Sequence, residues 1–145
     1  MRKSFIPLVL ILSLLSCTRE IKDHREKKWE DNLSLTIYNH EISEPEKDRM
    51  SFYVVYIDKV ESGRTTTGLE SQEKYFSINL QPNKHLITLE KWVLDKSKGR
   101  YVKLNNIEQP KPGFIYIIIQ ENKQTAVTMK EANNGVAVYT SELVE

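Results

Sequence analysis

Residues 75–94, with the sequence YFSINLQPNKHLITLEKWVL, contain the pattern that decides the fold class. From Tyr75 to Leu80, apolar residues alternate with more polar ones, which is the period of a half-buried β-strand. The next four residues, Gln81-Pro82-Asn83-Lys84, have the composition of a turn. Residues 85–94 then continue as a second strand. This stretch therefore predicts two strands, with the chain reversing direction between them.

The same strand period recurs on both sides of this stretch. We predict further strands over residues 33–38, 50–60, 101–104, 114–120, 125–130 and 136–140. Residues 41–49 and 61–74 are predicted as polar loops. Residues 105–112, which contain two prolines, are predicted to cross between two sheets. The run 114–120 is the most apolar of the exported part and is predicted to be a buried strand.

About eight strands separated by turn signals predict an all-β fold. We expect an immunoglobulin-like or prealbumin-like sandwich of about eight antiparallel strands. No segment shows a convincing helical period, and no internal repeat is visible at solenoid or propeller spacing. The sandwich is expected to span residues 32–145.

The first 16 residues have the layout of a secretory leader. Arg2 and Lys3 precede an almost wholly apolar run over residues 5–15, and the small residue Ser16 follows. This run is shorter than the roughly 20 residues that a membrane-spanning helix needs. We therefore expect residues 1–16 to be a cleaved signal peptide.

Leu14-Leu15-Ser16-Cys17 resembles the lipobox of bacterial lipoproteins, and Cys17 is the chain's single cysteine. The resemblance implies that a diacylglycerol is attached to the Cys17 thiol, that the chain is cut before Cys17, and that the new amine is acylated. The alternative is an ordinary secretory leader followed by a chance cysteine. Lipidation would place the protein in the cell envelope, and Thr18, by analogy with known sorting rules, would permit transfer to the outer membrane where the cell has one.

Residues 17–31 are rich in both acidic and basic side chains and contain only Ile21 and Trp29 as large apolar residues. Such a segment buries too little apolar surface to offset the entropy of ordering. We expect it to be a solvated tether between the lipidated cysteine and the domain.

Residues 76–89 carry a second resemblance, to the strand–turn–strand of PEGA-type and related prealbumin-like modules. In that pattern an alternating strand is followed by Pro-Gly-Lys/Tyr-His and another apolar strand. Here Asn83 replaces the usual glycine, and asparagine tolerates a left-handed turn position. The resemblance implies a sandwich that serves as a surface or accessory module, and it implies no catalytic residues.

Composition argues against several classes of function. The chain has 21 basic and 20 acidic residues among 145, and loss of the leader changes its net charge from +1 to −1. A nucleic-acid partner, which needs a basic face, is therefore not expected. None of the three histidines stands in a metal-binding motif, and no nucleophilic serine motif is present. We expect no cofactor, no metal and no enzymatic activity.

The aromatic residues of the predicted strands suggest one possible binding face. Alternation in residues 85–94 places Glu90 and Trp92 on the partly polar side, where Arg100 and Tyr101 could approach across the next turn. An aromatic residue flanked by charges has the composition of an interface anchor. The alternative is that this face packs under the tether or the 61–74 loop, and that Trp92 belongs to a satellite core.

These observations predict a membrane-anchored lipoprotein with a non-catalytic β-sandwich. Its domain is expected to be monomeric and to bind a protein, glycan or other ligand at the surface or in the envelope. The alternative is a structural or accessory subunit of an envelope complex, and an enzyme ranks third.

Overall fold

The computed structural model describes residues 31–39, 42–132 and 134–144. The expected leader, Cys17 and nearly all of the tether lie outside these residues. Within the described residues the chain forms ten strands and one short 3-10 helix, η1 (Pro45–Lys47). The strands are β1 (Leu33–Asn39), β2 (Met50–Ile57), β3 (Val60–Arg64), β4 (Gly68–Leu69), β5 (Lys74–Ile78), β6 (Lys84–Asp95), β7 (Arg100–Lys103), β8 (Phe114–Ile118), β9 (Gln124–Glu131) and β10 (Ala137–Val144).

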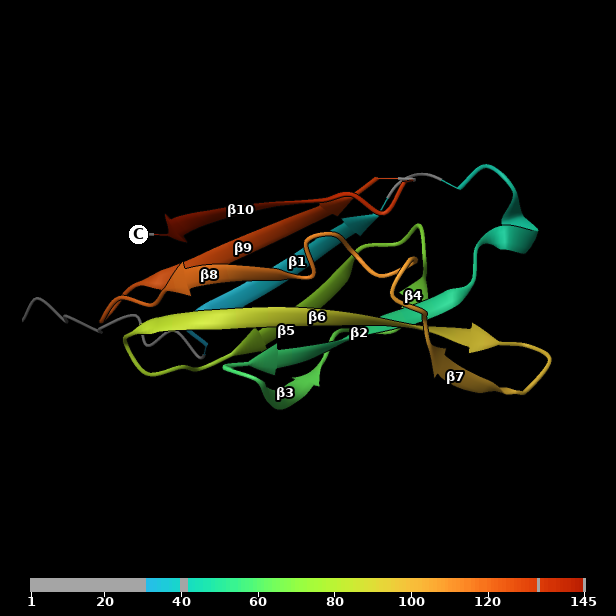
Figure 1. The fold of residues 1–145 in the computed structure, drawn as a ribbon. Helices are drawn as coiled ribbons and strands as arrows, with labels where there is room; N and C mark the ends of the chain where they lie inside the picture. The colour runs from blue at the N-terminus through green and yellow to red at the C-terminus, as the bar shows by residue number, and fades with distance from the viewer. Residues whose placement is uncertain (1–30, 40–41, 133, 145) are drawn as a thin grey trace, which may run out of the picture.

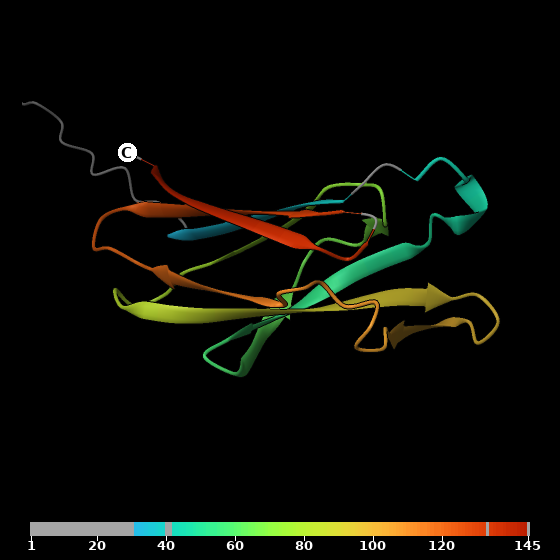
Figure 2. The ribbon, with the colours of Figure 1, turned by 45° about the horizontal axis from the view of Figure 1, so that its top comes forward.

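The strands form two sheets that pack face to face (Figures 1 and 2). Sheet A has the order β10-β9-β1-β5. Sheet B has the order β3-β2-β6-β7, with β4 also paired to β2 and β8 also paired to β6. The all-β sandwich predicted from the alternating pattern is thereby confirmed. One pairing differs from the expected antiparallel arrangement, because β1 and β9 run parallel.

The core lies between the sheets and follows from the alternation of each strand. Leu33, Leu35 and Ile37 of β1 are fully buried, and the register of sheet A places Leu35 and Ile37 beside Val127 and Met129 of β9. The members contributed by sheet B and its flanking segments are Tyr53, Val55, Ile57, Ile87, Leu89, Ile117 and Ile119. A cluster of this size in one contiguous core gives a domain without disulfides enough buried apolar surface to fold.

The residues from 75 to 94 form two strands, but these strands do not pair with each other. β5 pairs with β1 in sheet A, whereas β6 pairs with β2, β7 and β8 in sheet B. The turn residues 81–83 therefore carry the chain from one sheet to the other. Local alternation predicts a strand but does not identify its neighbour, so the sequence pattern left open that these two strands belong to different sheets.

The segment 61–74, predicted as a polar loop, contains two strands. A tight turn at Asp58 and Lys59, both with positive φ (51° and 70°), sends the chain back as β3 against β2. Two-residue hairpins favour such φ values, usually with Asn-Gly or Asp-Gly at the turn. Asp58 fits the first position, but Lys59 stands where glycine is usual, so the sequence signal of this hairpin is weak.

Two predictions for residues 105–120 were also wrong. The segment 104–113 joins β7 to β8 within sheet B, and the crossing to sheet A follows β8 instead. β8 is an edge strand whose only strand partner among the described residues is β6. Its alternate residues Phe114, Tyr116 and Ile118 are 49%, 57% and 62% exposed. The uniformly apolar run was predicted to be buried, but only Ile117, Ile119 and, in part, Ile115 face the core.

Candidate functional site

Three charged side chains lie buried at one end of the sandwich. Lys91 is on β6, Glu131 is the last residue of β9, and Glu70 follows β4. Strand alternation carries the first two inward, because Lys91 follows Ile87 and Leu89 on the core face, and Glu131 follows Val127 and Met129. Buried charges require partners, since an isolated charge in a protein interior is strongly destabilising.

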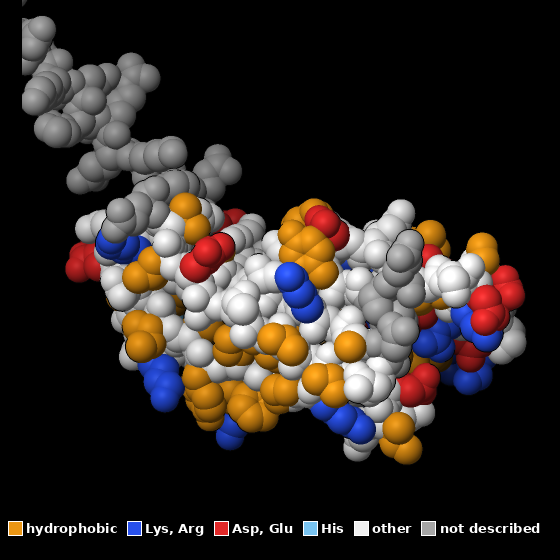
Figure 3. Space-filling model, turned by 90° about the horizontal axis from the view of Figure 1, so that it is seen from above, with side chains coloured by type: hydrophobic (Ala, Val, Ile, Leu, Met, Phe, Trp, Pro, Cys, Tyr) orange, Lys and Arg blue, Asp and Glu red, His pale blue; other side chains and the backbone are white. Residues whose placement is uncertain are grey.

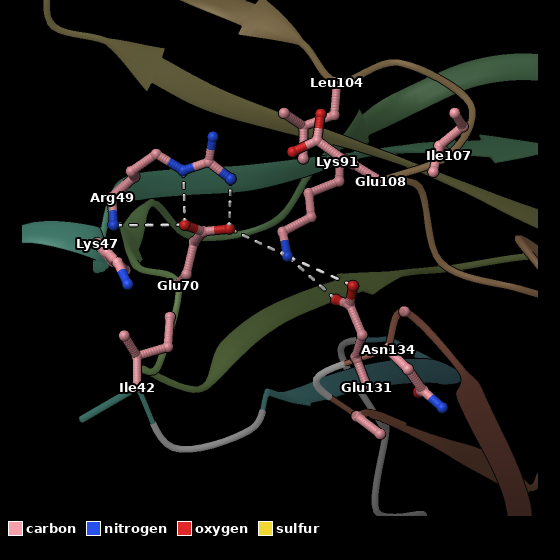
Figure 4. A pocket seen from close by; sticks show the side chains of 12 residues that line it. Ile42, Lys47, Arg49, Glu70, Lys91, Leu104, Ile107, Glu108, Glu131 and Asn134 are labelled. Atoms are coloured by element: carbon pink, nitrogen blue, oxygen red, sulfur yellow. Dashed lines mark hydrogen bonds and ion pairs between the residues drawn. The ribbon is translucent and has the colours of Figure 1, made fainter. Parts of the chain in front are cut away.

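The Lys91 ammonium group lies between the two buried carboxylates (Figure 4). Its Nζ is 3.3 Å from Glu70 Oε1 and 3.3 Å from Glu131 Oε2. Glu70 also accepts two hydrogen bonds from the Arg49 guanidinium, from Nε to Oε2 at 2.8 Å and from Nη2 to Oε1 at 3.1 Å. The four groups form an electrically balanced chain, Arg49–Glu70–Lys91–Glu131, that joins sheet B to sheet A.

The pKa of Glu70 reflects this pairing. Burial alone would raise the pKa, but the hydrogen bond from Arg49 and the charges of Lys91 and Arg49 lower it below the usual value. Glu70 is therefore ionised at neutral pH. The bidentate contact with Arg49 is of the strong, charge-assisted kind.

Tyr53 extends the chain of polar groups across the core. Its hydroxyl lies 2.5 Å from Glu131 Oε2 and 3.1 Å from Asn39 Oδ1. Burial, together with the negative charge of Glu131, raises the pKa of Tyr53 well above its usual value. The hydroxyl thus stays protonated and donates a hydrogen bond. Asn39 Nδ2 in turn donates to the carbonyl oxygen of Glu70, so the network closes on itself.

A further buried cation, Lys74, lies at the start of β5. Its Nζ donates to the carbonyl oxygens of Leu69 (2.7 Å) and Gln72 (3.0 Å). Burial, with a contribution from the charge of Lys91, lowers the pKa of Lys74 to about 8. In the part of the chain that the structure describes, no carboxylate forms an ion pair with Lys74, in contrast to Lys91.

A cavity of about 390 Å³ opens above this network. Its floor is formed by Glu70, Lys91 and Glu131, and its apolar wall by Ile42, Leu104 and Ile107. The other lining residues are Lys47, Arg49, Glu108, Ala132, Asn134 and Gly135. Figure 4 shows these side chains arriving from several segments around one hollow. The volume is within the range of ligand pockets, which begins at about 300 Å³.

The lining of this pocket combines charged and apolar side chains. Both signs of charge are present, and the described lining residues include no serine, threonine, cysteine or histidine. Lys91 and Glu70, the groups that could exchange protons, are held in ion pairs with each other. Among the described residues, no group of three or more His, Cys, Asp or Glu side chains is arranged to hold a metal ion.

The face predicted to bind a partner is only partly assembled. Trp92 and Glu90 share the outer face of sheet B, and Trp92 Nε1 donates to Glu90 Oε1 at 2.9 Å. The register of β6 and β7 places Tyr101 opposite Leu94 on the same face, but Arg100 opposite Asp95 on the other. The structure therefore brings three of the four predicted residues together and places Arg100 elsewhere.

The outer aromatic residues cover one another. Trp92 stacks on Phe52, with ring centroids 6.2 Å apart and 7° between the ring planes. The ring centroid of Tyr101 lies 5.0 Å from that of Phe52. The Arg64 guanidinium lies 5.2 Å from the centre of the Phe52 ring. Phe52 is only 6% exposed as a result, and Trp92 is half-buried. This cluster agrees in part with the alternative that Trp92 belongs to a satellite core. Of the two segments expected to cover it, the 61–74 segment contributes Arg64.

The comparisons with known proteins found no relative. No family model matches the sequence. No curated protein and no solved structure matches it either. In the part of the chain that the structure describes, no helix has the length and apolar character needed to cross a bilayer.

The sequence prediction missed the pocket, although its strands carry a signal. A charged residue interrupts the core-facing series at Lys91 in β6, at Glu131 in β9 and at Lys74 in β5. One charged residue at a core-facing position is common. Three of them in one small sandwich indicate that these side chains form a common buried polar site. The interruptions can be read only once the core-facing side of each strand is known.

Proposed function

We propose that the protein is a lipid-anchored, non-catalytic binding module of the cell envelope, and that a polypeptide partner binds in the pocket above Lys91. The observation that carries this proposal is the place of the pocket. β1 enters the domain at Leu33 and ends at Asn39, whose side chain contacts Glu70 in the pocket floor. In Figure 1, β1 runs towards the end of the sandwich where β4 lies. Because Glu70 directly follows β4 and lines the pocket, the pocket is at the opposite end from the point where the chain enters.

This arrangement suits a tethered binder. A lipid on Cys17 would hold the entry end towards the membrane, and the pocket would then face away from it. The apolar wall of Ile42, Leu104 and Ile107 offers contacts for an apolar side chain. Lys47 and Glu108 at the rim offer charges of both signs, as an extended peptide with mixed side chains requires.

The lipid anchor is tested by metabolic labelling. Cells that produce the full chain should incorporate a labelled fatty acid into it, and Cys17→Ala should abolish this label and leave an unprocessed or released form. Label of equal strength on the Ala variant would show that Cys17 is not the anchor.

The pocket is tested by site-specific photo-crosslinking in the same cells. A photoreactive amino acid replaces Ile107, which is 78% exposed at the pocket, and in a matched variant it replaces Val60, which is 66% exposed on the β2–β3 hairpin. We expect a discrete adduct from position 107 that is absent at position 60. Adducts of the same size at both positions, or at neither, would contradict a partner in the pocket.

The second candidate function is a structural or accessory subunit of an envelope complex. The uncharged, exposed edge strand β8 favours it, because such an edge is suited to pairing with another chain. Protease treatment of intact cells separates the two functions. Loss of the domain supports a surface binder, whereas protection supports a subunit inside the envelope.

A further inference from the structure

Strand β8 has an unpaired edge. Gly113 O accepts from Leu89 N, and Ile119 N donates to Asn83 O, both at 2.8 Å, at the two ends of its ladder with β6. Because bonded and non-bonded residues alternate in an antiparallel ladder, Ile115 and Ile117 direct their backbone groups to β6. The N–H and C=O groups of Phe114 and Tyr116 point the other way, and the described residues supply no partner for them.

The side chains along this edge are apolar and exposed. Phe114, Tyr116 and Ile118 lie on the outer face of sheet B and are about half exposed or more. The rings of Phe114 and Tyr116 contact each other edge to face, with centroids 6.1 Å apart. Figure 3 shows hydrophobic side chains gathering along one long edge of the molecule.

The other edge strands of the two sheets are protected in the usual way. Charged side chains on an edge discourage pairing with another chain. Such residues are Glu61 and Arg64 in β3, Lys74 in β5, Arg100 and Lys103 in β7, and Glu142 in β10. Among the edge strands of four or more residues that the structure describes, β8 alone has none. This contrast indicates that the β8 edge is kept open for a partner strand.

We propose that β8 pairs antiparallel with β8 of a second copy of this chain, about a twofold axis through Tyr116. The strand can pair with an identical strand, because the outward-facing residues at its two ends and at its centre are all apolar or aromatic. With Tyr116 facing Tyr116 of the other copy, Phe114 faces Ile118 at both ends. Each facing pair has outward backbone groups. The carbonyl oxygen of Ile118 already accepts from Thr125 Oγ1 at 3.4 Å, but it has a second lone pair, so the pairing forms on the order of six hydrogen bonds.

This arrangement satisfies the geometry of a closed dimer. Aromatic–aliphatic pairs across neighbouring strands stabilise a sheet, and two Phe114–Ile118 pairs would form on the outer face. An isologous contact uses the same surface on both copies and leaves no free β8 edge for further growth. Lys84 Nζ on β6 lies 4.6 Å from the centre of the Tyr116 ring. Because β6 pairs with the other edge of β8, this contact leaves the outer edge of β8 open.

Disulfide trapping tests this register directly. In an antiparallel bonded pair the facing Cα atoms are about 5.5 Å apart, which a disulfide can bridge. Tyr116→Cys in the full chain, oxidised with copper phenanthroline in a cell lysate, should give a disulfide-linked dimer on a non-reducing gel. The unsubstituted chain, which contains Cys17, is oxidised in parallel as the background.

The neighbouring positions are the matched controls. Residue 114 lies about 14 Å from its own counterpart in this register, because four residues separate it from the facing position. Phe114→Cys alone and Ile118→Cys alone should therefore not cross-link, whereas a lysate that contains both variants should give the mixed dimer. All three positions are exposed, so these substitutions leave the core intact.

Three outcomes would overturn the proposal. In the first, Tyr116→Cys gives no dimer above background. In the second, all single variants cross-link equally. In the third, the adduct has the mass of a complex with a different protein. Because the experiment uses a lysate, it does not depend on where the protein is located or on its lipid anchor. Failure of the lipid-anchored binding function would leave its result unchanged.

Discussion

Tyr53 on β2 and Glu131 on β9 are in direct contact, with the phenol hydroxyl 2.5 Å from the carboxylate, and the contact joins the two sheets at the pocket end of the sandwich. Glu131 also neutralises Lys91, so one carboxylate serves two buried partners from sheet B. The polar site is therefore part of what holds the sandwich together, as well as the floor of the pocket.

Glu131→Ala should lower the free energy of unfolding by about 3 kcal/mol, because it leaves the buried Lys91 charge and the Tyr53 hydroxyl without their shared partner. Urea denaturation followed by circular dichroism measures this change. Glu108→Ala, at an exposed residue of the same pocket, is the control and should change stability by less than about 0.5 kcal/mol. Equal losses from both variants would show that the buried network contributes little.

The stability of the domain should rise between about pH 8 and about pH 10.5, because of Lys74. Its pKa in the folded protein is about 8, below the ordinary value of 10.5. The unfolded chain therefore binds the proton more tightly in this interval, and removing the proton favours folding. Urea midpoints across the interval measure the slope, which Lys74→Met should flatten. An unchanged slope in that variant would exclude Lys74 as the source.

Ile117 and Ile118 are adjacent in β8 but differ sharply in exposure, at 2% and 62%. Ile117→Asp should unfold the domain, because an unpaired charge in the core costs several kcal/mol, on the order of the whole stability of a small domain. Ile118→Asp should leave the domain folded, with an almost unchanged circular dichroism spectrum. If both variants unfold, or neither does, the inward and outward faces of β8 are wrongly assigned.

Trp92→Ala should lower stability by about 2 kcal/mol, because it removes the ring that stacks on Phe52 and opens a nearly buried aromatic residue to water. Trp92→Phe retains a stacking ring and should cost less. Thermal unfolding of both variants, with Tyr75→Ala as the control at a 51% exposed aromatic residue, measures the difference. A loss no larger than that of the control would indicate that the outer cluster contributes no stability.

The alternating pattern was sufficient to predict the sandwich and the inner face of most strands. The core-facing sides of β1 and β6 follow directly from the positions of Leu33, Leu35 and Ile37 and of Ile87 and Leu89. Alternation is a local property, however, and strand pairing is not. The parallel neighbours β1 and β9, and the separation of β5 from β6, depend on contacts between distant residues that no local pattern records.

The pocket was not predicted because its members come from distant parts of the chain. Arg49, Glu70, Lys91 and Glu131 become neighbours only when the sheets pack. The outer cluster was predicted better, since Glu90 and Trp92 lie on one strand and Tyr101 follows one turn later. Arg100 was assigned to the same face because the register of β6 with β7 was not known.

The parallel pair β1–β9 also sets the order in which the domain can be completed. A polypeptide emerges from the ribosome with its N-terminus first, so Leu33 to Asn39 must wait until Gln124 to Glu131 have been made before sheet A can form its central ladder. Chains truncated before residue 124 would leave the side of β1 that faces β9 without a partner. The domain therefore becomes complete only after β9 has been synthesised, and until then the central ladder of sheet A cannot form.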